Sequence, residues 1–297
     1  MNPLNKYSTN SILLDTPLYC CMLGLTPSLG ARSPILWNRF FECNHIHCRM
    51  YPVDIPNDLS IRKLLDDLSD DPNFLGAAVA APYKTTVFES TSVTVDDPSA
   101  QSSCSVNNIF RSKDGRLMGA NTDAHAAIYT IMPFLKMYSQ LLNEKPRVLC
   151  LGLGATGRAI ASLLSEYSHV TAWNRSSSSI VDSFAAEYNI DLLKVLPSDI
   201  SSFSLVINST TVGSDQFSNA SNYLLDSLVI STLGHPSLYF EVNYSPAVTR
   251  QANLFIDSGF PYINGILMNR MQAAIAISNC FVDFDSSTVL DMIRNDS

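Results

Sequence analysis

Three glycines with a fixed spacing carry the most specific chemical signal in this chain. Gly152, Gly154 and Gly157 form a G-x-G-x-x-G motif in the stretch GLGATG. The first glycine allows a tight turn, the second lets backbone N–H groups approach a pyrophosphate, and the third lets a helix pack closely on a strand. The start of that helix also presents a positive dipole end to phosphate. The motif predicts a dinucleotide site that includes Ala155 and Thr156.

The stretches around the glycines supply the elements that such a loop needs. Residues 147–151 (RVLCL) have the apolar run of a buried strand, residues 158–167 continue as a helix, and residues 170–173 form the next strand. Together they make one βαβ unit. A glycine turn without a ligand is the alternative, but this placement favours a Rossmann nucleotide site.

The residue that ends the second strand distinguishes between dinucleotides. A carboxylate there holds the ribose 2′-hydroxyl of NAD, whereas a cation accepts the 2′-phosphate of NADP. Here the strand ends in Asn174, Arg175 and Ser176, and no Asp or Glu follows before Asp182. The guanidinium of Arg175 can pair with phosphate and stack on adenine. The sequence therefore predicts NADP(H) and disfavours an S-adenosylmethionine-dependent methyltransferase.

Apolar spacing predicts further strands and helices. The expected strands are residues 18–23, 49–53, 76–81, 106–110, 116–118, 205–208 and 238–243, and the expected helices begin at Pro34 or span 58–68 and 179–188. The dipeptide Asp114-Gly115 between two apolar runs indicates a β-hairpin. Strands that alternate with helices indicate parallel sheets with crossovers. The fold class predicted is α/β.

Seven segments, in the same order, resemble motifs of the shikimate dehydrogenase family. They are GAAVAAPYK (76–84) for G-x-N-V-T-x-P-x-K, SVN (105–107) for A-V-N, GANTD (119–123) for G-x-N-T-D, NRS (174–176) for N-R-T, NSTTVG (208–213) for N-x-T-x-x-G, YSPAVT (244–249) for Y-x-P-x-x-T, and GILMNRMQ (265–272) for G-x-x-M-x-x-x-Q. The resemblance implies two domains: a substrate domain of residues 1–123 plus 262–297, and a Rossmann NADP-binding domain of residues 124–261, with the site in the cleft.

The resemblance also implies roles for individual residues. Lys84 and Asp123 would form the catalytic pair, Asn107 would hold the reacting hydroxyl, Gln272 would contact another substrate oxygen, and Tyr244 the polar rim of the substrate. For the cofactor it adds Asn208, Thr210 and Gly265 to the glycine loop and to residues 174–176.

The residue types of the catalytic pair agree with this chemistry. Hydride transfer to NADP⁺ requires removal of the alcohol proton as the carbonyl forms, and a Lys/Asp pair in a closed cleft can relay that proton or stabilise the oxyanion. Without its motif, Lys84 would be interpreted as a solvated surface charge.

The chain departs from the family in the residues that bind the substrate. The family begins with two serines in S-x-S-P, which bind a carboxylate, whereas this chain reads Gly-Ala31-Arg32-Ser33-Pro with about one residue inserted upstream. Ala78 and Ala80 replace the asparagine and threonine of N-V-T. Each lost hydrogen bond to a charged group costs roughly 1.5–3 kcal/mol. We therefore expect a changed substrate. Only Ser33 matches the serine pair, and Arg32 is the alternative partner for a carboxylate.

Composition excludes several classes of function. The 297 residues are 46% hydrophobic and 15% charged, and the net charge is −8, which predicts a globular, soluble protein. Because there is no block of Lys or Arg and no apolar run of about 18 residues, neither nucleic acid nor membrane is an expected partner. The polar start of the chain predicts a cytoplasmic protein. We expect a small-molecule partner, a cyclic alcohol or ketone, and either a monomer or a homodimer.

The cysteines and histidines give no metal pattern. The seven cysteines include no C-x-x-C pair, so reduced and mostly buried thiols are expected. His45 and His47 lie near Cys43 and Cys48, but the spacing fits no standard zinc site. No metal is predicted.

Four functions are compatible with these residues. The first is an NADP(H)-dependent oxidoreductase of this type that acts on a substrate other than shikimate. The second is an ordinary shikimate, quinate or aminoshikimate dehydrogenase in which Arg32 and Ser33 replace the serine pair. The third is an imine reductase, in which Lys84 or Asp123 protonates the amine, and the fourth is a non-catalytic metabolite sensor.

Overall fold

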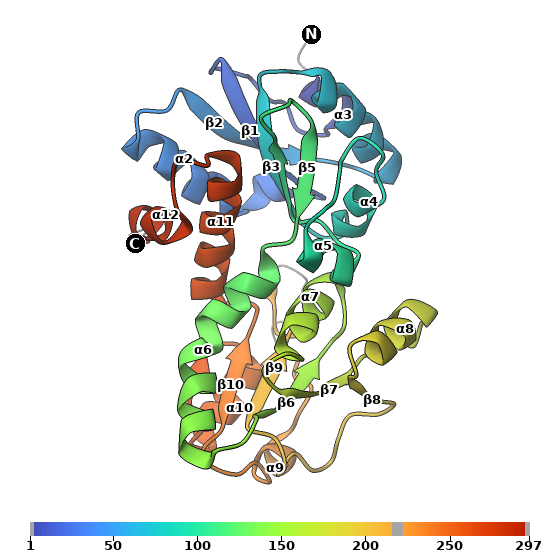
Figure 1. Cartoon of the computed structure of the whole chain (residues 1–297), viewed down its shortest axis with the longest axis vertical. Helices are drawn as coiled ribbons and strands as arrows, with labels where there is room; N and C mark the ends of the chain where they lie inside the picture. Colours follow the sequence, from blue (N-terminus) through green and yellow to red (C-terminus); the bar gives the residue numbers. More distant parts are fainter. Residues whose placement is uncertain (1–2, 216–221, 295–297) are drawn as a thin grey trace. The chain divides into compact units, whose positions relative to one another are not determined.

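The structure, a computed structural model, describes residues 3–215 and 222–294 and divides into two compact units (Figure 1). The first unit consists of Met1–Thr122 and Arg270–Ser297, and the second of Asp123–Asn269.

These bounds differ from the predicted ones at both places where the chain passes from one unit to the other. Asp123 begins helix α6 (Asp123–Leu142) of the second unit. Tyr262–Ile263 forms strand β11, which pairs in parallel with β10 (Leu238–Glu241). Because that pairing extends the sheet of the second unit, residues 262–269 belong to the second unit and not to the substrate domain.

The first unit is built on a mixed five-stranded sheet in the order β2-β1-β3-β4-β5. Strands β1, β2 and β3 are parallel, and the β3–β4 and β4–β5 pairs are antiparallel. The strands are β1 (Leu18–Gly24), β2 (Cys48–Asp54), β3 (Phe74–Val79), β4 (Asn108–Arg111) and β5 (Leu117–Ala120). The other elements are α1 (Leu4–Tyr7), the 3₁₀ helix η1 (Pro27–Leu29), α2 (Ser33–Cys43), α3 (Asp58–Asp70), α4 (Lys84–Phe88), α5 (Pro98–Ser103) and α12 (Ser286–Ile293).

Local sequence explains two of these elements well. Helix α3 begins where the Asn57 side chain accepts a hydrogen bond from Ser60 N–H, and its predicted apolar face, which is Ile61, Leu64, Leu65 and Leu68, is completely buried. The predicted hairpin is confirmed as β4–β5, with Gly115 at a positive φ of 91° in the turn.

The second unit contains a parallel six-stranded sheet in the order β11-β10-β9-β6-β7-β8. Its remaining strands are β6 (Arg147–Leu151), β7 (His169–Trp173), β8 (Asp191–Leu193) and β9 (Leu205–Asn208). Its remaining helices are α7 (Ala155–Leu164), α8 (Ser179–Glu187), α9 (Ser227–Ile230) and α10 (Arg250–Asp257). This is the Rossmann strand order, which confirms the predicted fold class. Ligands of such sheets bind outside the carboxyl ends of the strands at the switch point, here between β6 and β9.

The C-terminal segment returns to the first unit within α11 (Ile266–Cys280), from Arg270 onward. Phe281 and Phe284 pack on Phe40 of α2, with ring centroids 5.7 and 5.0 Å away, and Arg39 donates a hydrogen bond to the carbonyl of Met292. Figure 1 shows α12, in red, beside the blue α2. Within the residues that the structure describes, no helix is both long and apolar enough to cross a membrane.

Candidate active site

The glycine loop lies between β6 and α7, at the switch point of the second sheet. Gly152 has a positive φ of 99°, and a Cβ atom on Gly157 would stand 2.2 Å from the carbonyl oxygen of Gly152. Gly154 differs from both, because a Cβ atom there would meet no atom of the described residues within 4 Å. Two glycines are thus required by the fold itself, whereas Gly154 borders open space at the start of α7, where Ala155 is the first residue. That space suits a pyrophosphate.

The end of β7 lies beside this loop. Asn174 accepts a hydrogen bond from Leu153 N–H at 2.9 Å and donates one to the carbonyl of Ser176 at 2.7 Å. It therefore ties the two loops together. Arg175 is exposed and makes no hydrogen bond or ion pair with any described residue. Its guanidinium is available for an anion such as a 2′-phosphate.

Hydrogen bonds between its own residues stabilise the loop after β9. Asn208 is completely buried, and its Oδ1 accepts hydrogen bonds from the N–H and hydroxyl of Thr210. Its Nδ2 donates to the carbonyl of Val212 at 3.0 Å. Gly265 has a packing role, since a Cβ atom there would lie 2.0 Å from the carbonyl oxygen of Val242. Asn208, Thr210 and Gly265 thus shape the walls of the predicted cofactor site, whatever else they contact.

Glu241, at the carboxyl end of β10, is a residue that the sequence analysis missed. Its completely buried carboxylate accepts hydrogen bonds from the side chains of Asn208 (3.0 Å), Tyr239 (2.7 Å) and Thr249 (3.1 Å), and from both the backbone and side chain of Asn243. Burial raises the pKa of Glu241, and these donors oppose that rise. An acidic residue inside the apolar run YFEV was a usable signal. The network joins the loop after β9 to the loop after β10, which carries Tyr244.

The predicted substrate-binding serine lies at the start of α2 in the first unit. Ser33 is the first residue of α2 and is buried, and Arg32 is its N-cap. The loop before it is fastened by Ser28, which donates its N–H and its hydroxyl to the two carboxylate oxygens of Asp54. Gly24 lies at the other end of this loop, where a Cβ atom would be 3.4 Å from that of Ala80. The alanine that replaces the family threonine therefore lies against this loop.

Lys84 is the first residue of α4, and a backbone hydrogen bond fixes its position. Its carbonyl accepts a hydrogen bond from Val106 N–H at 2.9 Å, which places it next to the segment that carries Asn107. Helix α4 is fastened to α3, because the Thr86 hydroxyl donates to Asp58 at 3.0 Å.

Asn107 and Gln272 come together through a residue without a predicted role, Thr122. The Oδ1 of Asn107 accepts a hydrogen bond from Thr122 N–H at 2.9 Å, and its Nδ2 donates to the Thr122 hydroxyl at 3.1 Å. The same hydroxyl lies 3.5 Å from Oε1 of Gln272 on α11. Two predicted substrate contacts from distant parts of the sequence thus form one polar cluster.

Asp123 is the first residue of α6 and belongs to the second unit, whereas Lys84 belongs to the first. Its side chain is buried, and its Oδ2 accepts a hydrogen bond from the Thr156 hydroxyl at 2.9 Å. The Thr156 side chain therefore contacts the predicted catalytic carboxylate, in addition to the cofactor role predicted for the glycine loop.

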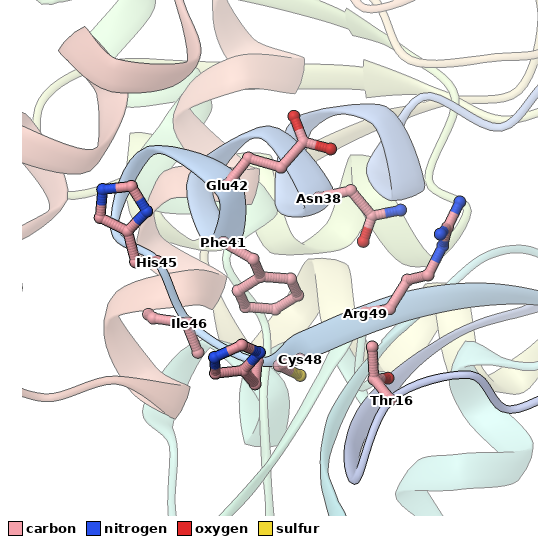
Figure 2. A pocket seen from close by; sticks show the side chains of 9 residues that line it. Thr16, Asn38, Phe41, Glu42, His45, Ile46, Cys48 and Arg49 are labelled. Carbon is pink, nitrogen blue, oxygen red and sulfur yellow. The ribbon is translucent and has the colours of Figure 1, made fainter.

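A separate pocket of about 400 Å³ lies between the second half of α2 and the start of β2 (Figure 2). Phe41, Ile46 and Cys48 contribute apolar surface, and His45 and His47 are exposed around it. None of the predicted catalytic or binding residues lines this pocket. Among the described residues, no group of three or more His, Cys, Asp or Glu could hold a metal ion.

Comparisons with known proteins show what this chain is similar to. No family model matches the chain. It is 24% identical over 269 residues to a Lysinibacillus sphaericus protein named shikimate dehydrogenase (NADP(+)), across 88% of this chain and 91% of that protein.

Two solved structures share the fold. Shikimate 5-dehydrogenase from Thermus thermophilus, in complex with NADP(H) and shikimate, has a TM-score of 0.75 and 23% identity, with 93% of this chain and 98% of that chain covered. The ligand-free form of 5-ketofructose reductase of Gluconobacter sp. has a TM-score of 0.71 and 20% identity, with 95% of this chain and 99% of that chain covered. The ordered motifs and the sequence similarity support an assignment to the shikimate dehydrogenase family as a divergent member, and the solved structures show the shared fold.

Proposed function

We propose that this protein is an NADP(H)-dependent oxidoreductase that interconverts an alcohol and a ketone, and that its substrate is a cyclic compound less polar than shikimate. The observation that carries the proposal is a contrast between the residues for the cofactor and catalysis and the residues for substrate binding. The glycine loop and the predicted catalytic residues are all present, whereas alanines occupy the positions from which the family motif offers polar side chains to the substrate.

The residues of the second unit fit the cofactor. The open space beside Gly154 and the N-terminus of α7 would hold the pyrophosphate. The exposed Arg175 would hold the 2′-phosphate. NADPH, when bound, supplies the hydride. The relative from Lysinibacillus sphaericus, which is named for NADP(+), supports this choice.

Lys84 and Asp123 are proposed to move the proton. As a carbonyl is reduced, its oxygen gains charge and must receive a proton, and a positioned acid typically contributes about 10²–10⁴-fold in rate. Asn107 would orient that oxygen through its amide, whose conformation is fixed by Thr122. Gln272, Tyr244, Ser33 and Arg32 would contact the other polar atoms of the substrate.

The residues around the loop before α2 support a less polar substrate. Ala78 is buried at the end of β3, and Ala80 lies against Gly24. Leu25 and Leu29 in the same loop are exposed to 51% and 82%. A polyol at this wall would lose hydrogen bonds to water without gaining replacements, which disfavours its binding. The name of the Gluconobacter neighbour indicates that this fold occurs in a reductase of a ketone other than 3-dehydroshikimate.

The relatives named shikimate dehydrogenase favour one further candidate, ordinary reduction of 3-dehydroshikimate. A single assay separates the two. NADPH oxidation would be followed with 3-dehydroshikimate and with a panel of cyclic ketones that lack its carboxylate or hydroxyls. We expect at least one panel ketone to exceed 3-dehydroshikimate in kcat/KM by about tenfold or more. Turnover of 3-dehydroshikimate at about 10⁴ M⁻¹s⁻¹ or above would show an ordinary shikimate dehydrogenase.

The same panel, extended to cyclic imines, tests the remaining alternatives. Preferential reduction of imines would identify an imine reductase. Tight binding of NADPH and of a metabolite without turnover would identify a sensor.

A further inference from the structure

One hydrogen bond joins the glycine loop to the predicted catalytic carboxylate. The Thr156 hydroxyl donates to Oδ2 of Asp123 at 2.9 Å. Both residues belong to the second unit. Thr156 is in the first turn of α7 and Asp123 is the first residue of α6, and the two helices pack against each other. The bond therefore connects the starts of two neighbouring helices.

The two side chains in this bond are well suited to fix each other. Threonine is stiff at χ1 because it is branched at Cβ, and a hydroxyl bond to a carboxylate is stronger than one between neutral groups. Asp123 is only 5% exposed, so water competes weakly for the carboxylate. An aspartate held this way has fewer rotamers to lose when it meets a substrate.

We propose that Thr156 is a positioning residue for Asp123, so that the loop which binds the cofactor pyrophosphate also sets the conformation of the carboxylate that moves the proton. This inference rests on the proposed function. It gives the Thr156 side chain a role distinct from that of its backbone N–H, which lies in the first turn of α7 and would serve the phosphates. Loss of the hydroxyl alone would then impair turnover and leave cofactor affinity unchanged.

The experiment uses variants that separate the hydroxyl from the shape of the side chain. Thr156→Val keeps the shape and removes the hydroxyl, whereas Thr156→Ser keeps the hydroxyl. Thr130→Val is the matched control, because the Thr130 hydroxyl is also buried but, among the residues that the structure describes, it bonds only to the carbonyl of Ala126 within α6. Kd for NADPH would be measured by fluorescence titration, and kcat and KM with the ketone that gives the highest rate in the panel.

We expect kcat to fall about tenfold in Thr156→Val and to remain within about twofold in Thr156→Ser and Thr130→Val. The Kd for NADPH should stay within about twofold in all three. In an Asp123→Ala background, Thr156→Val should lower kcat by less than about twofold further, because the hydroxyl acts through the carboxylate. Unchanged kcat in Thr156→Val, equal losses in the valine and serine variants, or a loss confined to NADPH affinity would each overturn the proposal.

A second measurement separates this inference from the proposed function. Urea unfolding of the ligand-free wild type, Thr156→Val, Asp123→Ala and the double variant forms a double-mutant cycle that needs no substrate. We expect the two residues to be coupled by about tenfold in the unfolding equilibrium constant. If no ketone is turned over, the proposed function fails while the cycle still reports on the bond. If the cycle shows no coupling, the positioning role fails whatever the activity.

Discussion

The glycine loop of the second unit and the substrate wall of the first differ in what their sequence must supply. In the glycine loop, backbone geometry makes the site: Gly152 has a positive φ, and Gly157 leaves no room for a side chain. In the proposed substrate wall, formed by Ala31, Ala78 and Ala80, the family motif has side-chain donors. Ala78 in β3 and Ala80 just after β3 replace two of them here, and the strand still forms. A site made by the backbone is constrained by the fold, whereas a site made by side chains can change its ligand and keep its fold.

The largest expected effect tests whether a side chain of the first unit carries the chemistry. Lys84→Met should lower kcat by about 10²–10⁴-fold while the Kd for NADPH stays within about twofold, because proton transfer is lost and the glycine loop is in the other unit. Lys63→Met, a change at an exposed lysine on α3, is the matched control and should behave as wild type. Steady-state kinetics with the best panel ketone gives kcat. Near-normal turnover in Lys84→Met would remove the proposed chemistry from this residue.

The next effect separates the two kinds of glycine. Gly157→Ala should destabilise the fold by about 1–3 kcal/mol, because its methyl group would collide with the carbonyl oxygen of Gly152. The added methyl of Gly154→Ala meets no atom of the described part of the chain within 4 Å, so stability should change by less than about 1 kcal/mol. NADPH, however, should bind at least tenfold more weakly. Urea unfolding and fluorescence titration measure these quantities. Unaltered NADPH affinity in Gly154→Ala would place the pyrophosphate elsewhere.

A smaller effect is expected at the end of β7, where the Arg175 side chain is proposed to select the dinucleotide. The wild type should bind NADPH at least tenfold more tightly than NADH, and Arg175→Ala should remove most of this preference. Such a factor corresponds to about 1.4 kcal/mol. Kd for both dinucleotides would be measured in both proteins. A preference that survives in Arg175→Ala, or equal affinities in the wild type, would contradict the role of Arg175.

Restoring the family's hydroxyl side chains in the first unit tests whether their loss lowers activity with shikimate. Ala31→Ser with Ala80→Thr returns two hydroxyl donors, so kcat/KM for shikimate with NADP⁺ should rise several-fold. Ala126→Ser, on α6, is a control for an added hydroxyl outside the proposed substrate wall. If the double variant gains nothing, the alignment around the inserted residue or the role of these positions is wrong.

Patterns local in the sequence predicted the strands well. The apolar runs at 18–23, 147–151 and 205–208 correspond to β1, β6 and β9. Helix α6 was not predicted, although it is the longest one described, because Pro133 lies inside it and a proline normally interrupts a helix. The structure places residues 262–269 in the second unit for a different reason: β11 has only two residues and is defined by its pairing with β10.

The sequence indicated the residue types of the candidate site but not the contacts between them. The motifs indicated Lys84, Asn107 and Asp123, because each lies in a stretch with a recognisable spacing. The contacts of Thr122 with Gln272 and of Thr156 with Asp123 join residues far apart in the chain. Only the folded arrangement determines such pairs, so sequence spacing could not reveal them.

The smallest expected effect concerns Glu241, whose side chain joins the loop after β9 to the loop after β10. Because burial raises its pKa in the folded state, the protonated form favours folding. Its contribution to stability is therefore fully present below the pKa of the unfolded chain and is lost as the pH rises through the folded pKa. In Glu241→Gln this titration is absent, and the lost acceptor costs the same at every pH. The free energy of unfolding of the wild type, minus that of Glu241→Gln, should thus fall as the pH rises through and above the ordinary glutamate range. Urea unfolding of both proteins across a pH series measures this difference. A difference that instead grew with pH would mean that the donors from Asn208, Tyr239, Asn243 and Thr249 outweigh burial, and that the carboxylate holds the two loops together as an anion.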